Sequence, residues 1–196
     1  PEDIRLVFPE ARPEYRYDPS LYRLTNMDGD EIGIERVFYV RPGVLQLVPS
    51  EPLDPKRLHR VGITYLDKSA LVTYDGWFRH LYSPKKLGAD YDRRTDRTII
   101  RLFAPRAELI KLYLYQEPGS DPENTIDMVR DPHGVWEAFL PGNRKGWYYD
   151  FTAHGPDGPG NHFYGTNPVH FSDPWGRVSL DSFGPTRIWP QMEPAT

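Results

Sequence analysis

The chain has 196 residues, a formal net charge of −4 and no cysteine. This length is enough for one large domain or for two modest domains, each with its own core. Lys and Arg are scattered rather than clustered, which argues against a nucleic-acid partner. The lack of cysteine excludes disulfides and thiolate metal sites, and no apolar run approaches the roughly 20 residues of a membrane-spanning helix.

The sequence leaves the cellular compartment open. The absence of cysteine favours a reducing environment such as the cytoplasm. The chain begins with Pro1 rather than Met, so we expect a processed piece of a longer protein, from which any signal peptide would already be missing.

The composition indicates strands and turns rather than helices. The chain contains 13 Tyr, 21 Pro and 16 Gly, yet Pro and Gly stay below the share associated with disorder. We therefore expect a meander of short strands in the first 80 residues. It would include a hairpin over 31–48, one helical turn after Asp54 and a second hairpin over 61–78.

A second region is expected after residues 81–87, which carry Pro84 and two lysines. In its central stretch, residues 98–116, apolar and polar side chains alternate, and Pro105 interrupts the alternation. A period of two places one apolar face on a pleated strand. Because proline cannot donate to a strand ladder, the stretch predicts two paired strands joined by a turn. Further strands are expected over 125–129, 135–140, 147–153 and 169–171.

Several motifs of this second region occur in a characteristic order: Leu87-Gly-Ala89, the strand 98–105, the strand 110–115, Gly134-Val-Trp-Glu-Ala138, Gly146 with Tyr149 and Phe151, and Asp173-Pro-Trp175. Together they resemble carbohydrate-binding module family 48, an immunoglobulin-like module that precedes the catalytic barrel of starch- and glycogen-debranching enzymes. Type I pullulanases are most similar, since they also place a small β-domain before this module.

The resemblance implies an all-β fold of two consecutive immunoglobulin-like β-sandwich domains. We expect an N-terminal domain over 1–81, a family 48-like domain over 82–182, and a linker over 183–196 towards a catalytic barrel. The parent protein would be a glycoside hydrolase of family 13, a pullulanase acting on α-1,6-glucosidic bonds. A (β/α)8 barrel needs about 250 residues, and only 16 follow Leu180.

The chain would then be the non-catalytic front of the enzyme, positioning the barrel and contacting α-glucan weakly or indirectly. The alternative is an autonomous glycogen- or starch-binding module with an exposed aromatic platform. A free-standing hydrolase is disfavoured, because Asp127 and Asp131 lie in turns or at strand ends and no nucleophile or phosphate-binding motif is present. No catalytic residue and no cofactor are expected.

Histidines and carboxylates form one further cluster in the sequence: His154, His162 and His170 with Asp157 and Asp173. Such a set can hold a metal ion. Its spacing matches no metal-binding signature, however, so we interpret these as loop histidines and predict no metal site.

Aromatic residues decide whether the module binds sugar. Trp136 and Trp147 lie at alternating strand positions and are expected in the core, whereas Tyr113, Tyr115 and Tyr148 are expected on the outward face. These tyrosines form either a sugar-binding strip or a domain contact. In the family that the region resembles, glycogen binders carry exposed tryptophans and a lysine. Here the two loops concerned, 119–122 and 155–165, lack tryptophan, and Asp150 stands near the lysine position.

Two other tryptophans are expected to act as interdomain anchors. Trp77 lies near the end of the first region and would contact the second sandwich. Trp175 follows the last expected strand and would pack against a downstream barrel.

Overall fold

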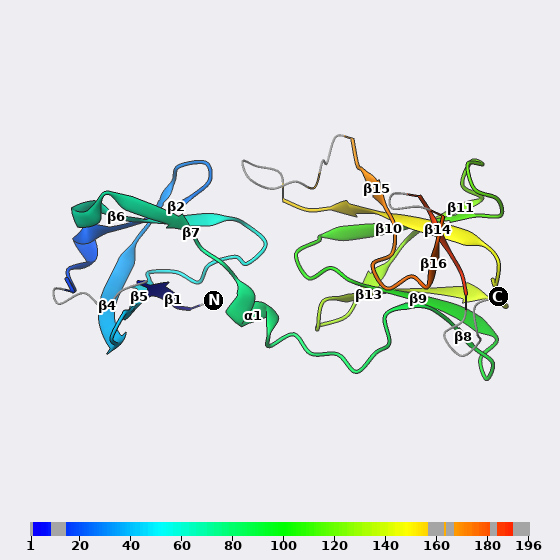
Figure 1. The fold of residues 1–196 in the computed structure, drawn as a ribbon, viewed down its shortest axis with the longest axis horizontal. Coiled ribbons are helices and arrows are strands. Elements are labelled where there is room, and N and C mark those ends of the chain that lie inside the picture. Colours follow the sequence, from blue (N-terminus) through cyan, green and yellow to red (C-terminus); the bar gives the residue numbers. More distant parts are fainter. Residues whose placement is uncertain (1, 9–14, 157–162, 164–166, 181–183, 190–196) are drawn as a thin grey trace. The chain divides into compact units, whose positions relative to one another are not determined.

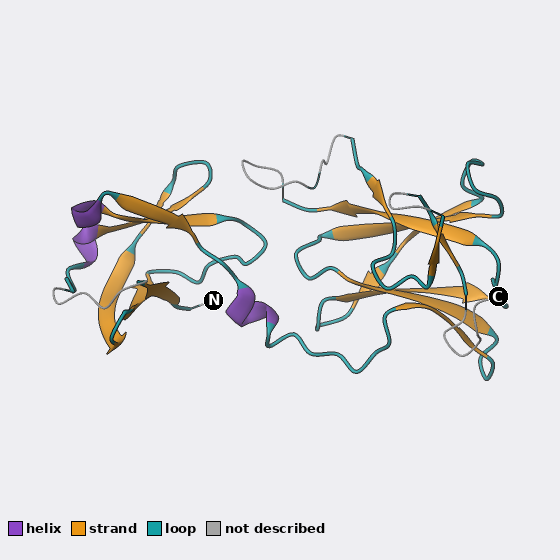
Figure 2. Ribbon diagram, viewed as in Figure 1, coloured by secondary structure: helices purple, strands orange, loops and turns teal. Residues whose placement is uncertain are grey.

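The computed structural model describes residues 2–8, 15–156, 163, 167–180 and 184–189. It divides into two compact units, the first extending to His80 and the second beginning at Leu81. Each unit consists of two antiparallel sheets (Figures 1 and 2), which confirms the predicted all-β class. None of the helices in the described part of the chain is long and apolar enough to cross a membrane.

The first unit packs a three-stranded sheet, in the order β1-β5-β4, against a four-stranded sheet, in the order β3-β2-β6-β7. A four-residue helix, α1 (Asp75–Phe78), follows the last strand. The strands are β1 (Ile4–Val7), β2 (Tyr22–Asn26), β3 (Glu31–Ile32), β4 (Ile34–Arg41), β5 (Val44–Pro49), β6 (His59–Ile63) and β7 (Lys68–Leu71).

The expected hairpin over 31–48 forms from residue 34 onward, because β4 and β5 pair antiparallel around Gly43. Glu31 and Ile32 instead pair with β2 in the other sheet. Gly43 has a φ of 79°, a left-handed value that favours glycine in the turn. The helical turn expected after Asp54 is only a hydrogen-bonded turn, in which Asp54 accepts from Arg57 N–H at 3.1 Å. The last expected strand ends at Leu71, and the chain then enters α1.

The second unit packs a sheet in the order β12-β13-β9-β8 against a sheet in the order β11-β10-β14-β17-β16, with β15 also beside β14. The strands are β8 (Gly88–Asp92), β9 (Arg97–Phe103), β10 (Leu109–Tyr115), β11 (Asn124–Asp127), β12 (Val129–Arg130), β13 (Val135–Pro141), β14 (Tyr148–His154), β15 (His170–Phe171), β16 (Val178–Ser179) and β17 (Thr186–Arg187).

The two strands predicted over 98–116 form, but their predicted pairing is wrong. β9 pairs with β13 and β8, whereas β10 pairs with β11 and β14 in the opposite sheet. The turn after Pro105 therefore crosses from one sheet to the other. It is held in the core by Ala107, which is buried, and by Trp136, whose indole N–H donates to the Ala104 carbonyl at 2.9 Å.

The core of the second unit lies between these two sheets. Completely burying one large apolar side chain stabilises the fold by about 1.5–3 kcal/mol, and the side chains buried here come from strands of both sheets. They include Ile100, Leu102, Ile110, Leu112, Leu114, Trp136, Tyr149, Phe151 and Ile188.

The tail differs from the linker that we expected from residue 183. Its described part supplies β17, which pairs with β14, and Ile188 and Trp189 are buried. Thr186 is also buried, and its hydroxyl accepts the backbone N–H of Asp173 at 3.0 Å. These contacts make residues 184–189 part of the second sandwich.

A charged cluster lies on the sheet of the second unit that contains β9 and β13. The Lys85 ammonium donates to Asp131 Oδ2 at 2.9 Å and to Glu137 Oε2 at 2.5 Å, while Arg101 Nε donates to Glu137 Oε1 at 2.7 Å. Burial acts to raise the pKa of Glu137, but the hydrogen bonds from Lys85 and Arg101 outweigh it, so the pKa lies below its ordinary value. The cluster ties the start of the unit to β9 and β13.

We expect Glu137→Gln to lower the free energy of unfolding by about 1–2 kcal/mol at neutral pH, because two charge-assisted hydrogen bonds are lost. A lowered carboxyl pKa stabilises the fold above the ordinary value of 4.5, and this contribution disappears as the pH falls through the folded-state pKa. The difference between wild type and variant, measured by urea unfolding, should therefore shrink in acid. Glu117→Gln, in an exposed loop, is the control. If the difference in unfolding free energy between wild type and Glu137→Gln did not change with pH, the lowered pKa of Glu137 would be contradicted.

Candidate functional site

The most distinctive surface of the second unit is the outer face of the sheet that contains β10 and β14. Ile110, Leu112 and Leu114 point into the core, so the alternating residues of β10 face outward. The strand register then sets Tyr113 opposite Asp150 and Tyr115 opposite Tyr148. We call this surface the tyrosine face and define it by Lys111, Tyr113, Tyr115, Tyr148, Asp150, Thr152, His154 and His170.

Asp150 lies at the centre of the tyrosine face. The Tyr115 hydroxyl donates to its two oxygens at 3.0 and 3.2 Å, and His170 Nδ1 lies 3.0 Å from Oδ1. Because a carboxylate only accepts, His170 donates in this contact. Burial raises the pKa of Asp150 above its ordinary value, although the hydrogen bonds from His170 and Tyr115 act in the opposite direction.

Tyr113 and His170 form the aromatic part of the face. Their ring centroids are 4.4 Å apart, with an interplanar angle of 48°. The Tyr113 hydroxyl lies 3.3 Å from the Thr152 hydroxyl, which lies 3.2 Å from His154 Nε2. A half-exposed ring pair is thus bordered by the His154 imidazole, which the buried Thr152 hydroxyl links to Tyr113.

Tyr148 occupies the end of the face. It is opposite Arg187 in the pairing of β14 with β17, and the guanidinium carbon lies 5.9 Å from the tyrosine ring centroid. That distance is compatible with a cation–π contact. The positive charge beside Tyr148 is thus that of Arg187 in β17, a strand that is distant from β14 in the sequence.

The structure brings the three predicted tyrosines together on one face, but it does not expose them equally. Tyr113 and Tyr148 are half-buried, whereas Tyr115 is only 8% exposed. The expected outward exposure of Tyr115 is therefore corrected: its hydroxyl turns to the buried Asp150 carboxylate, which needs hydrogen-bond donors. Asp150 likewise serves as an internal acceptor rather than as a free charge.

Sequence reasoning missed the part played by His170. His170 lies in β15, within the strand expected over 169–171, but its interpretation as a loop histidine is wrong: its side chain is 45% exposed and contacts Asp150. The two-residue strand pairs with β14 through Phe151 and Thr152. No local pattern predicts that pairing, since the two strands are joined through a long segment rich in Gly and Pro.

Two members of the histidine and carboxylate cluster, His162 and Asp157, lie outside the described residues. Among the residues that are described, no three His, Asp or Glu side chains could together hold a metal ion. Asp131 accepts the backbone N–H groups of His133 and Val135, each at 2.9 Å, which confirms its predicted place in a turn.

The tryptophans fall into two groups. Trp136 is buried and Trp147 packs against the core, as predicted. Trp175 is 42% exposed, and its backbone N–H donates to Asp173 Oδ1 at 2.8 Å. Trp77 belongs to α1 and packs against the core of the first unit, with its ring centroid 5.1 Å from that of Phe78. The anchoring roles of Trp77 and Trp175 stay predictions.

Comparison with known proteins shows the relatives of this chain. Residues 86–176 match carbohydrate-binding module 48 (isoamylase N-terminal domain). A glycogen debranching enzyme of Erwinia tasmaniensis is 34% identical over 73 residues, covering 37% of this chain and 10% of that protein. A glycogen operon protein GlgX homolog of Mycobacterium tuberculosis is 36% identical over 98 residues, covering 50% of this chain and 12% of that protein.

Solved structures show the fold over more of the chain. The pullulanase SAP of Group B Streptococcus, solved with maltotetraose, superposes with a TM-score of 0.61 at 16% identity, covering 98% of this chain and 26% of that one. The type I pullulanase of Bacillus subtilis, solved with maltose, gives a TM-score of 0.51 at 17% identity, covering 90% and 24%. The chain thus spans about a tenth of the curated relatives and a quarter of these structures.

The chain consists of immunoglobulin-like β-sandwich units, as the sequence predicted, and one outer sheet face of the second unit carries aromatic and polar side chains. The matched segment, residues 86–176, is similar to carbohydrate-binding module 48.

The raised pKa of Asp150 leads to a prediction about stability. A carboxyl whose folded-state pKa is raised stabilises the fold while protonated, and this contribution is lost as the pH rises from the ordinary value of 3.8 through the folded-state pKa. Asp150→Asn keeps an acceptor for Tyr115 and His170 without the buried charge. We therefore expect the variant to gain stability relative to wild type as the pH rises.

The measurement is urea unfolding at a series of pH values, from about 3, below the ordinary carboxyl pKa, up to about 7. Asp121→Asn, in an exposed loop, is the matched control. If Asp150→Asn instead lost stability relative to wild type as the pH rises, the charged Asp150 would be stabilising, and the raised pKa would be wrong.

Proposed function

We propose that this chain is the non-catalytic, α-glucan-binding region of a glycogen- or starch-debranching glycoside hydrolase, and that the tyrosine face is its binding surface. The observation that carries the proposal is the half-exposed Tyr113–His170 ring pair on a carbohydrate-binding module 48 domain. Its relatives named as a glycogen debranching enzyme and as pullulanases support the choice of α-glucan.

The chemistry of the face matches that of a glucose unit. A pyranose ring presents a flat patch of C–H groups, which packs on aromatic surface, and a rim of hydroxyls, which need hydrogen-bond partners. Tyr113 and His170 supply the surface. His154 supplies a polar group at the border of the pair. It is linked to Tyr113 through the Thr152 hydroxyl, which is buried and lies 3.3 Å from the Tyr113 hydroxyl and 3.2 Å from His154 Nε2.

The same geometry favours weak rather than tight binding. Tyr115 is buried and its hydroxyl is held by Asp150, so it offers a sugar neither a free face nor a free donor. Asp150 in turn is only 11% exposed in its side chain. The accessible aromatic area is thereby limited to Tyr113, His170 and Tyr148, which fits a module that assists a larger enzyme.

Affinity electrophoresis in gels containing glycogen or amylopectin tests the proposal. We expect the wild-type chain to be retarded and Tyr113→Ala to weaken binding about tenfold, or about 1.4 kcal/mol, because half of the ring pair is removed. Tyr148→Ala should weaken binding less, since Tyr148 lies beyond the pair.

The control is Phe139→Ala, which removes a 51% exposed aromatic from the opposite sheet of the same unit. Its mobility should equal that of wild type. If the wild-type chain migrated equally with and without glucan in the gel, the proposal that the tyrosine face binds glucan would be wrong.

A second role, positioning a downstream catalytic barrel, is favoured by Trp175. This large apolar side chain is 42% exposed, and its backbone is fixed by Asp173, which is buried and also accepts the Tyr149 hydroxyl at 2.5 Å. A rigidly held, exposed tryptophan is a typical anchor at protein interfaces.

In the parent enzyme, Trp175→Ala should lower the thermal midpoint of the catalytic domain by several degrees and reduce selectivity for branch points, because a buried anchor contributes about 2 kcal/mol or more. Calorimetry and the ratio of α-1,6 to α-1,4 cleavage would measure both. Leu180→Ala, at another exposed apolar side chain, is the control. Unchanged stability and selectivity would contradict a positioning role for this residue.

A further inference from the structure

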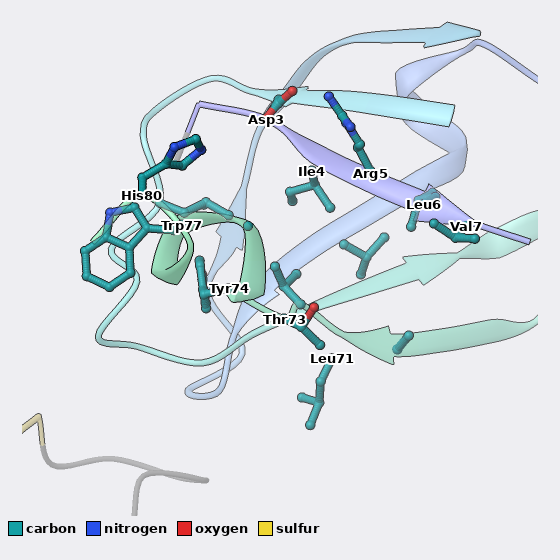
Figure 3. A pocket seen from close by; sticks show the side chains of 15 residues that line it. Asp3, Ile4, Arg5, Leu6, Val7, Leu71, Thr73, Tyr74, Trp77 and His80 are labelled. Carbon is teal, nitrogen blue, oxygen red and sulfur yellow. The ribbon is translucent and has the colours of Figure 1, made fainter. Parts of the chain in front are cut away.

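The first unit contains a groove between its two sheets. It opens between two edge strands, β1 of one sheet and β7 of the other. Its volume is about 620 Å³, within the range of about 300–1,000 Å³ that is usual for small-molecule sites. Figure 3 shows the β1 residues along one side, Leu71 and Thr73 on the other, and Trp77 with His80 at one end.

The groove has an apolar floor and a polar rim. The floor consists of core side chains, including Ile4, Val61 and Tyr74, each at most 7% exposed. Tyr74 is held there by a hydrogen bond with the buried His59. The rim carries one acid, one base, a hydroxyl and an imidazole: Asp3, Arg5, Thr73 and His80.

We propose that this groove binds a short stretch of α-glucan, as a second carbohydrate site separate from the tyrosine face. The inference rests on the proposed function for the identity of the sugar, but it stands on residues of the first unit alone. The C–H faces of glucose units would pack on the floor and on Trp77. Their hydroxyls would bond to Asp3, Arg5, Thr73 and His80.

The charges of the groove favour an uncharged ligand. Asp3 and Arg5 balance each other, so the groove selects neither anions nor cations, while both side chains make strong hydrogen bonds to hydroxyls. Asp3 already accepts from the Gln46 amide through Oδ2 at 2.7 Å, which orients its carboxylate and leaves Oδ1 for the ligand.

The main rival occupant is an extended peptide that adds a strand to β1 or β7. Both strands are short, with four residues each, and both carry an exposed cation, Arg5 in β1 and Lys68 in β7. Short, charged edge strands are the features that proteins use to prevent such pairing. The rim chemistry therefore favours a sugar over a strand.

The experiment is a titration of the full ¹⁵N-labelled chain with maltohexaose, followed by NMR. We expect the indole N–H resonance of Trp77 to move and saturate. Gly76→Phe should reduce this shift at least tenfold in apparent affinity, because a side chain at Gly76 enters open space at the groove and fills it without displacing the core. Phe also suits a helix better than Gly.

Tyr113→Ala separates this site from the tyrosine face. If the groove binds glucan, the Trp77 shift persists in Tyr113→Ala, even should the tyrosine face prove inactive. The proposal is overturned if Trp77 does not respond while Tyr113 and His170 do, or if the response survives in Gly76→Phe. It is also overturned if a peptide of alternating apolar residues, and not maltohexaose, shifts the amides of β1.

Discussion

The antiparallel pairing of β10 with β14 determines the surface on which our functional proposal depends. Leu112 lies opposite Phe151, and both side chains are completely buried. A slip of one residue would turn these side chains into solvent and bring Tyr113 and Asp150 into the core. The hydrophobic cost of that slip holds the register, and the register places the tyrosines, the aspartate and Thr152 on one outer face.

The buried carboxylate of Asp150 then organises this face. Removing an ionisable group from water is unfavourable unless hydrogen-bond donors compensate, and Asp150 obtains them from Tyr115 and His170. These contacts draw one tyrosine inward and hold the imidazole beside Tyr113. The result is a small ring pair with polar borders rather than a broad aromatic platform, which suits a modest affinity for a neutral polyhydroxylated ligand.

The proposed groove of the first unit is built on a different principle. There the two sheets do not close over the core between β1 and β7, so apolar side chains are reached from outside between polar rim residues. Two weak sites on one chain strengthen attachment to a long polymer, because binding at the first raises the effective concentration at the second. Such an arrangement would suit glycogen or starch better than a short oligosaccharide.

Much of this architecture follows from local patterns in the sequence. Alternating apolar residues correctly predicted the main strands, the core positions of Trp136 and Trp147, and the common face of Tyr113, Tyr115 and Tyr148. The ordered motifs between residues 87 and 175 correctly indicated carbohydrate-binding module 48. These features depend on periods of two and on turns within a few residues, which neighbouring side chains alone determine.

Long-range contacts decided the rest. Two strands show the same alternation of apolar and polar residues whether they pair within one sheet or lie in opposite sheets across the core. The pattern therefore could not show that the chain crosses from one sheet to the other after Pro105. Nor could it show that Thr186 and Arg187 pair with β14, that His170 reaches Asp150, or that Tyr115 is buried. Each of these contacts joins segments far apart in the chain, and its energy exists only once the sheets have assembled.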